Sequence, residues 1–186
     1  YENDGAANPS WSTTTIATSA AGARDIHIAD MDNDGDLDIV SASSGDDTIA
    51  WYENDGAANP SWTASDISYT ALGPRGIFLA DIDSDGDLDI VSASHDDDTI
   101  AWYENDGNSD PSFTKNVIST SADGARGVHI ADIDSDGDLD IVSASRIDNK
   151  IAWYANDGAN NPSWSTTTIA TSAAGARDIQ DRRAHV

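Results

Sequence analysis

The most constraining feature of the sequence is a repeat of 51 residues. The phrase Ala-Trp-Tyr-Glu-Asn-Asp-Gly begins at Ala50 and again at Ala101, and a third copy begins at Ala152 with alanine in place of the glutamate. A tyrosine returns every 51 residues without insertion or deletion, at Tyr1, Tyr52, Tyr103 and Tyr154. A strict period of this length predicts that one small structural unit is built several times along the chain.

The pattern within one period is typical of β-strands. Short β-rich runs are separated by clusters of Gly, Asn, Asp, Pro and Ser, and no helix-length periodicity of 3.6 residues is present. Four strands are expected in the first full period, at 25–29, 37–42, 48–52 and 62–69, with the isoleucines of 25–29 pointing inward. A four-stranded sheet has two faces to bury, so it must stack on its neighbours. The sequence therefore predicts an all-β chain of β-propeller blades, each with four antiparallel strands; a β-solenoid, the alternative, usually has shorter turns.

The domain boundaries follow the period. We expect one repeat domain over 1–179, with an N-terminal boundary piece at 1–23, blades at about 24–73, 74–124 and 125–174, and a partial fourth blade at 175–179. Residues 180–186 break the repeat, which indicates a disordered tail that comes from an out-of-frame end of a truncated gene. Three blades do not close a propeller, which needs about 4 to 8. The ring must be completed by oligomerisation or by missing sequence, and a homodimer is the first expectation.

The charge of the chain excludes several classes of partner. With 34 acidic and 9 basic residues, the formal net charge is −25, so the surface repels nucleic acid and anionic membranes and attracts cations. No apolar run approaches the roughly 20 residues that cross a bilayer. There are no cysteines, which excludes disulfides and thiolate metal sites.

Three nine-residue acidic loops are the strongest candidates for a function. Each has aspartate at positions 1, 3, 5, 7 and 9 and glycine at position 6, where a sharp turn lets the acidic side chains converge. Position 7 can add its backbone carbonyl. Oxygen ligands in this number favour Ca²⁺ over Mg²⁺, and without a cation the carboxylates would repel one another. We predict one calcium ion per loop, three per chain. The candidate metal-site residues are Asp30, Asp32, Asp34, Asp36, Asp38, Asp81, Asp83, Asp85, Asp87, Asp89, Asp132, Asp134, Asp136, Asp138 and Asp140.

The combination of motifs resembles a known family. The loop Asp-x-Asp-x-Asp-Gly-Asp-Leu-Asp-Ile-Val follows a Gly-x-Arg strand and precedes Ile-Ala-Trp-Tyr-Glu-Asn-Asp-Gly, which is similar to the FG-GAP/VCBS repeats. This resemblance implies blades of a calcium-bearing propeller, as in integrin α-subunits, fungal propeller lectins and bacterial extracellular proteins. It implies a secreted or cell-surface location, and calcium ligation by Asp30, Asp32, Asp34 and Asp38 and by their equivalents in the other loops.

Recurring aromatic and basic residues suggest further roles. Trp51, Trp102 and Trp153 are expected to pack between sheets. A second set could line a groove between blades and stack on sugar rings, with polar neighbours supplying hydrogen bonds. These candidate ligand-binding residues are Trp62, Asn54, Asp55, Phe113 and Trp164. The arginines of the Gly-x-Arg strands are expected to be structural partners of carboxylates or carbonyls, with binding of an acidic sugar as the alternative. His27 and His129 are interpreted as strand residues.

These patterns favour a binding module over an enzyme. No constellation of serine, histidine and aspartate stands out as a catalytic triad. The leading hypothesis is a calcium-stabilised extracellular propeller that binds a ligand, plausibly a glycan, in the manner of a lectin. The first alternative is a structural, self-assembling propeller scaffold without a small-molecule ligand. A fragment of a propeller lyase or dehydratase is the least favoured.

Overall fold

The computed structural model describes residues 2–3 and 5–177, and its regular elements are all β-strands. The first four-stranded sheet contains β3 (Ala23–Ala29), β4 (Asp38–Ser43), β5 (Thr48–Asn54) and β6 (Trp62–Ser68). The second contains β7 (Pro74–Ala80), β8 (Asp89–Ser94), β9 (Thr99–Asn105) and β10 (Phe113–Ser119). The third contains β11 (Ala125–Ala131), β12 (Asp140–Ser145), β13 (Lys150–Asn156) and β14 (Trp164–Ala170). Among the described residues, no helix is long and apolar enough to cross a membrane.

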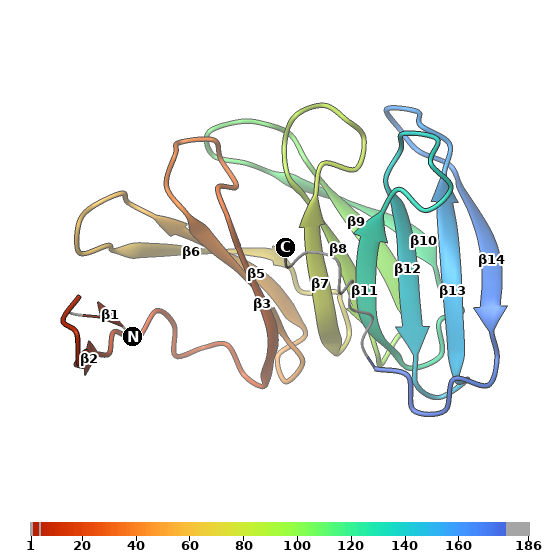
Figure 1. Cartoon of the computed structure of the whole chain (residues 1–186), viewed down its shortest axis with the longest axis horizontal. Coiled ribbons are helices and arrows are strands. Elements are labelled where there is room, and N and C mark those ends of the chain that lie inside the picture. Colours follow the sequence, from red (N-terminus) through yellow and green to blue (C-terminus); the bar gives the residue numbers. More distant parts are fainter. Residues whose placement is uncertain (1, 4, 178–186) are drawn as a thin grey trace.

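Each sheet has the topology of a propeller blade. The four strands pair antiparallel with their neighbours in chain order, and the three sheets stand next to one another (Figure 1). The strands that the sequence predicts are confirmed, and their ends differ by at most a few residues. The predicted all-β class and four antiparallel strands per repeat are therefore correct.

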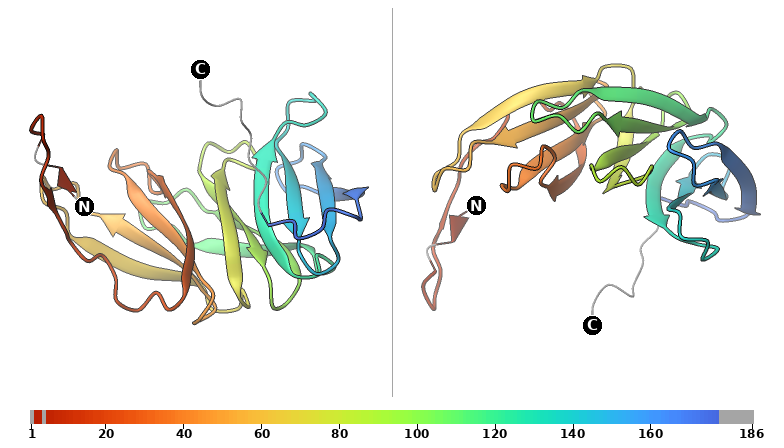
Figure 2. Two further views of the ribbon diagram at one scale, coloured as in Figure 1. Left: turned by 60° about the horizontal axis from the view of Figure 1, so that its bottom comes forward. Right: turned by 90° about the horizontal axis from the view of Figure 1, so that it is seen from above.

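The blades are arranged in an open arc. The first strands of the blades, β3, β7 and β11, lie side by side on the inner side, and the last strands, β6, β10 and β14, lie on the outer side (Figure 2). The three sheets thus form an open arc that does not close into a ring. The three blades occupy 23–68, 74–119 and 125–170, while the predicted tail 180–186 and the end of the predicted fourth piece lie outside the described residues.

A small hairpin precedes the first blade. Strand β1 (Glu2–Asn3) pairs with β2 (Trp11–Ser12), and Asn3 faces Trp11 across the pair. The same register joins Asn54 to Trp62 between β5 and β6. The hairpin therefore has the pairing of the outer two strands of a blade, one period earlier in the repeat.

The hydrophobic cores lie between blades. The first core joins Trp51, Val40 and Ile49 of the first blade to Ile77 and other residues of the second, and the second core repeats this arrangement one period later around Trp102. Trp51 and Trp102 are 2% and 0% exposed, which confirms the prediction that they pack between sheets. Each blade is consequently stabilised by its neighbours.

The inward orientation expected for the isoleucines of the first strand is wrong in the first blade. Ile26 and Ile28 of β3 are 59% and 60% exposed, whereas Ile77, the second-blade counterpart of Ile26, is 2% exposed. The reason is that these side chains point toward the position of a preceding blade. They form the unpartnered face of the first sheet.

Candidate metal centre

The three acidic loops connect the first and second strands of their blades. Each loop turns through two residues of positive φ, at positions 4 and 6. Position 6 is glycine, with φ of 97° at Gly35, 104° at Gly86 and 103° at Gly137. At these angles a Cβ atom is disfavoured, so glycine is required for the turn. The sequence prediction of a sharp turn at this position is confirmed.

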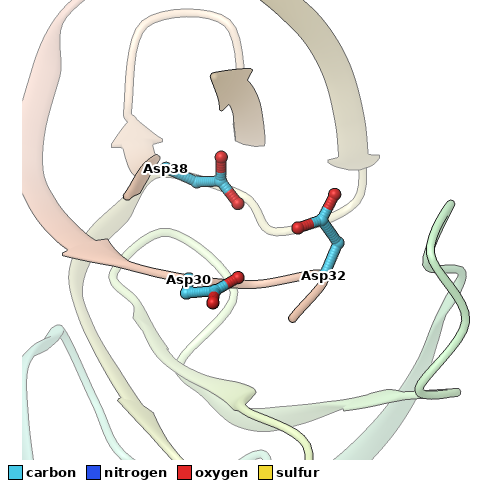
Figure 3. Close-up of side chains that lie close together, drawn as sticks. All are labelled: Asp30, Asp32 and Asp38. Atoms are coloured by element: carbon cyan, nitrogen blue, oxygen red, sulfur yellow. The ribbon is translucent and has the colours of Figure 1, made fainter. Parts of the chain in front are cut away.

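The turn brings carboxylates together. In the first loop, ligand atoms of Asp30, Asp32 and Asp38 lie within 4.8 Å of one another and face a common space (Figure 3). The second and third loops each bring three aspartates together within the same distance, but with the fifth aspartate of the loop in place of the ninth. These groups are Asp81, Asp83 and Asp85 and, one period later, Asp132, Asp134 and Asp136. The loops thus present oxygen donors at spacings that suit a hard cation.

The first aspartate of each loop also holds the loop backbone. Asp30 accepts hydrogen bonds from the backbone N–H groups of Asp34 (3.1 Å) and Gly35 (3.0 Å). Asp81 does the same one period later. These bonds fix the shape of the turn before any ion is considered, so the donor set is preorganised.

The ninth aspartate ties the loop to the rest of the blade. Asp89 is 1% exposed and accepts hydrogen bonds from the backbone N–H groups of Ile82 (3.0 Å) and Asn105 (2.8 Å). Burial raises the pKa of this carboxyl to about 7, although the two N–H donors oppose the shift. Asp38 and Asp140 occupy the same buried position in the other blades. A nearby cation would favour the ionised form of these groups.

The third aspartates are held in an electrostatically unfavourable environment. The pKa of Asp83 is raised by desolvation and by the neighbouring carboxylates Asp85, Glu104 and Asp81. Asp32 and Asp134 have raised pKa values for the same two kinds of reason. The arrangement therefore concentrates negative charge that a divalent cation would neutralise.

The seventh aspartates are directed differently. A side chain added at Gly56 would collide with the carboxylate of Asp36, and the same relation joins Gly107 to Asp87 and Gly158 to Asp138. In addition, the Asp87 carboxylate accepts a hydrogen bond from the side-chain amide of Asn33 (2.7 Å). The structure thus places these carboxylates against the loop after the third strand, and leaves the backbone carbonyl as the group that position 7 could offer to an ion.

The residues predicted to bind a sugar have intramolecular contacts. Asn54 donates to the carbonyl of Leu37 (3.1 Å), and Asp55 accepts from the backbone N–H groups of Ala57 and Ser61 (3.2 and 3.0 Å). The three aromatic rings are only partly buried; Phe113 packs against the first interblade core and Trp164 against the second. They lie at equivalent points, the start of the outermost strand. These aromatic residues are Trp62, Phe113 and Trp164.

Two sets of residues join the blades in a role that was not predicted from the sequence. Asn105 donates to the carbonyl of Met31 in the preceding blade (3.0 Å), and Asn156 donates to that of Ile82 (3.1 Å). Asp47, in the turn before β5, accepts from the backbone N–H of Gly73 in the next blade (2.7 Å). The presence of an asparagine at the same place in every repeat was the available signal.

The comparison with protein families agrees with this geometry. The family model described as "FG-GAP-like repeat" matches residues 30–92 and 81–143, together more than half of the chain. Each match begins at the first aspartate of one acidic loop and ends in the strand after the next loop. A comparison with curated proteins found no significant match. The sequence motifs, the four-stranded blades and the family match lead to one conclusion: the chain belongs to the FG-GAP-like repeat family.

Proposed function

We propose that the chain is a calcium-stabilised, extracellular propeller module that binds a ligand and catalyses no reaction. The observation that carries the calcium assignment is a cluster of three aspartates in each of three loops, with ligand atoms within 4.8 Å of one another. The cluster holds loop positions 1, 3 and 9 in the first loop and positions 1, 3 and 5 in the other two. The buried ninth aspartates and the raised pKa values at the third position add support, because both describe negative charge without a compensating cation among the described residues.

The role proposed for calcium is structural. An ion in the first loop would connect the end of β3 to the start of β4 through Asp30 and Asp38. Asp38 also holds the end of β5 through the N–H of Asn54. When bound, the ion supplies charge neutralisation and a fixed geometry at this junction. Repeats of this family are typical of extracellular proteins, where calcium is abundant, and this supports the proposed location.

Calcium removal tests this proposal. The protein would be stripped with a chelator and its thermal unfolding followed with calcium, with magnesium or with neither. Extracellular calcium modules bind with Kd of roughly 10⁻⁴ to 10⁻³ M, and a hundredfold excess over Kd stabilises by about 2.7 kcal/mol per site. We expect a large rise in melting temperature with calcium and a much smaller one with magnesium. An unchanged melting temperature in calcium would rule out the metal assignment.

A glycan is the ligand class that we propose for the aromatic residues at the start of the outermost strands. The support comes from the partly exposed aromatic rings at the start of each outermost strand, because such rings can stack on the apolar face of a sugar. A glycan array probed with the calcium-loaded protein tests this. Binding to a defined sugar that is lost in Trp62→Ala would support it, and an array without any signal would contradict it.

A second candidate function is self-assembly, and a specific observation favours it. The exposed residues Ile26 and Ile28 on the first blade are copies of residues that are buried against a neighbouring blade elsewhere in the chain. On the opposite face of the third blade, Ile133 is 47% exposed, whereas its counterpart Met31 is 1% exposed. The two open faces are therefore complementary copies of the two sides of one internal interface. We propose that a second copy of the chain packs head-to-tail on them, as in a homodimer.

A further inference from the structure

The inner side of the arc contains a cavity with an unusual charge. It has a volume of about 220 Å³ and is lined by four arginines, one from each successive Gly-x-Arg motif. The other lining residues are Asp25, Gly76, Gly127 and Val128. The arginines are Arg24, Arg75, Arg126 and Arg177. Four of the nine lysines and arginines of the chain thus meet in one place, although the net charge of the protein is −25.

A backbone irregularity positions these arginines. The pairing of the first strand with the second shifts register between Ala23 and Asp25, between Pro74 and Gly76, and between Ala125 and Gly127. The residue at each shift is the arginine. A β-bulge leaves its extra residue outside the regular pairing and redirects its side chain. Three blades therefore direct a guanidinium into the cavity by the same device.

The guanidinium groups are poorly satisfied by the protein. The Nε atoms of Arg75 and Arg126 are buried and have no hydrogen-bond partner. Within the described part of the chain, the ion pairs are His95 with Asp96 and Lys150 with Asp148, so none of the four arginines has a carboxylate partner. The prediction gave these arginines a carboxylate or a carbonyl as structural partner; among the described residues, the carboxylate part of that prediction is wrong.

The first blade shows what a satisfied arginine looks like. Arg24 donates from Nε to the hydroxyl of Ser44 (2.8 Å). The residues one and two periods after Ser44 are His95 and Arg146, and the arginines of those blades are the ones with unpartnered Nε atoms. The second and third blades thus have a histidine and an arginine in place of the serine that accepts this bond.

The charges in the cavity act on one another. Desolvation lowers the pKa of Arg126, and repulsion from Arg75, Arg146, Arg177 and Arg24 lowers it further. Asp25 is the one acidic residue in the wall, and its carboxylate oxygens already accept hydrogen bonds from the backbone N–H groups of Ile26 and Ile77 (3.0 and 3.1 Å). An anion in the cavity would relieve this repulsion.

We infer that this cavity is a binding site for an oxyanion, meaning a carboxylate, sulfate or phosphate group held by guanidiniums from successive blades. Arginine suits such groups because its planar fork donates two parallel hydrogen bonds to them. The site goes beyond the proposed function, since it uses neither the acidic loops nor the aromatic residues. The acidic loops lie at the opposite end of the first strand of each blade. Six residues of extended chain separate each arginine from the first aspartate of its loop, which corresponds to about 20 Å.

Binding can be measured directly on the calcium-loaded protein. Sulfate and galacturonate would be titrated at constant ionic strength in chloride buffer, with galactose as the neutral comparison, while the Nε–H resonances of the arginines are followed by NMR. We expect saturable shifts of the Arg75 and Arg126 signals with sulfate, galacturonate or both. The stronger of the two identifies the source of the oxyanion as a sulfo group or a sugar carboxylate. Shifts that do not saturate with either anion would overturn the inference.

Matched variants locate the site. Arg126→Gln removes one charge from the cavity and should weaken anion binding by about tenfold, the loss of one charge-assisted bidentate contact. Lys115→Gln makes the same change of charge on outer strand β10 and should leave the affinity unchanged. Asp25→Asn keeps an acceptor for Ile77 and removes the single acidic charge, so it should tighten binding. Equal losses in Arg126→Gln and Lys115→Gln would show general charge attraction and contradict the site.

The calcium titration separates this inference from the proposed function. Arg126→Gln should retain the full calcium-dependent rise in melting temperature, because it lies far from the acidic loops. Absence of anion binding in a protein that still responds to calcium would overturn the oxyanion site alone. Saturable anion binding without a calcium response would overturn the calcium assignment alone.

Discussion

The side-chain amide of Asn105 donates a hydrogen bond to the backbone carbonyl of Met31, 3.0 Å away in the preceding blade. Met31 is the second residue of the first acidic loop, and the backbone N–H of Asn105 is held by Asp89 of the second loop. One residue thus connects two acidic loops across a blade interface. Asn156 repeats the connection to Ile82 between the second and third blades.

We predict that Asn105→Ala is strongly destabilising. The side chain of Asn105 is 1% exposed and also donates to the carbonyl of Leu88, so its removal leaves one buried and one partly buried carbonyl without this donor. Leaving buried polar groups unsatisfied costs about 1 to 3 kcal/mol. Urea unfolding at saturating calcium measures the loss. Asn54→Ala is the matched control when both variants are made in an Ile28→Asp background, where no second copy is expected on the first blade. Asn54 then makes the equivalent bond within its own blade but none to a preceding one, and equal losses in both variants would contradict the interblade role.

The contact between Asn105 and Met31 shows the limit of what the sequence could predict. The strands follow from local signals, because Gly and Asp-rich turns mark every strand end and recur with the period. The convergence of Asp30 and Asp32 also follows, since both lie in one short loop. Residues 74 positions apart become neighbours only through the stacking of blades, which a pattern along the chain does not describe. The direction of the Asp36 carboxylate depends in the same way on packing against Gly56.

Calcium binding should depend on the third aspartate more than on the seventh. Asp83→Asn removes a carboxylate from the converging group and should weaken calcium binding at the second loop at least tenfold, which corresponds to about 1.4 kcal/mol. Asp87→Asn makes the same change of charge in the same loop, but the Asp87 carboxylate lies against Gly107 and its backbone carbonyl is unaltered. It should have a much smaller effect in isothermal titration calorimetry. A larger loss in Asp87→Asn would instead place that carboxylate on the ion.

The loop after the third strand of the second blade should make the free energy of unfolding depend on pH in the acid range. Hydrogen bonds from the hydroxyl and the backbone N–H of Ser112 lower the pKa of Asp106 to about 2, from about 3.9 in an unfolded chain. A carboxyl with a lowered folded pKa stabilises the fold above the unfolded pKa, and this contribution is lost as pH falls toward the folded pKa. Asp106→Ala should therefore be less stable than the parent at neutral pH, and the difference should shrink between about pH 4 and pH 2.

Asp110 provides the comparison for that experiment. It is exposed in the same loop, so Asp110→Ala should change stability little at any pH. Thermal unfolding of both variants over this pH range, with calcium held constant, gives the two differences. If the difference in stability between Asp106→Ala and the parent stays constant as the pH falls, the hydrogen bonds to the ionised Asp106 carboxylate do not stabilise the fold.

Self-association should depend on the open face of the first blade. Ile28 is 60% exposed there, whereas Ile130, its third-blade counterpart, is 7% exposed against a neighbouring blade. Ile28→Asp would place a charge in the proposed contact with the third blade of a second copy, where an unpaired charge is costly to bury. We expect the parent to sediment as a dimer and Ile28→Asp to sediment as a monomer in analytical ultracentrifugation.

The variant Val117→Asp distinguishes this contact from nonspecific hydrophobic association. Val117 is 56% exposed, nearly the same as Ile28, but it lies on outer strand β10 in the middle of the arc. If a second copy docks on the end faces, Val117→Asp should leave the dimer intact. Two polar groups support the same orientation. Among the described residues, the Asn54 side chain has no carbonyl of a preceding blade to donate to, and the Ile133 carbonyl has no asparagine of a following blade to accept from. A head-to-tail dimer would pair these two groups as Asn105 pairs with Met31. Asn54→Ala should therefore also weaken the dimer. A dimer that persists in both the Ile28→Asp and the Asn54→Ala variants would place the contact elsewhere.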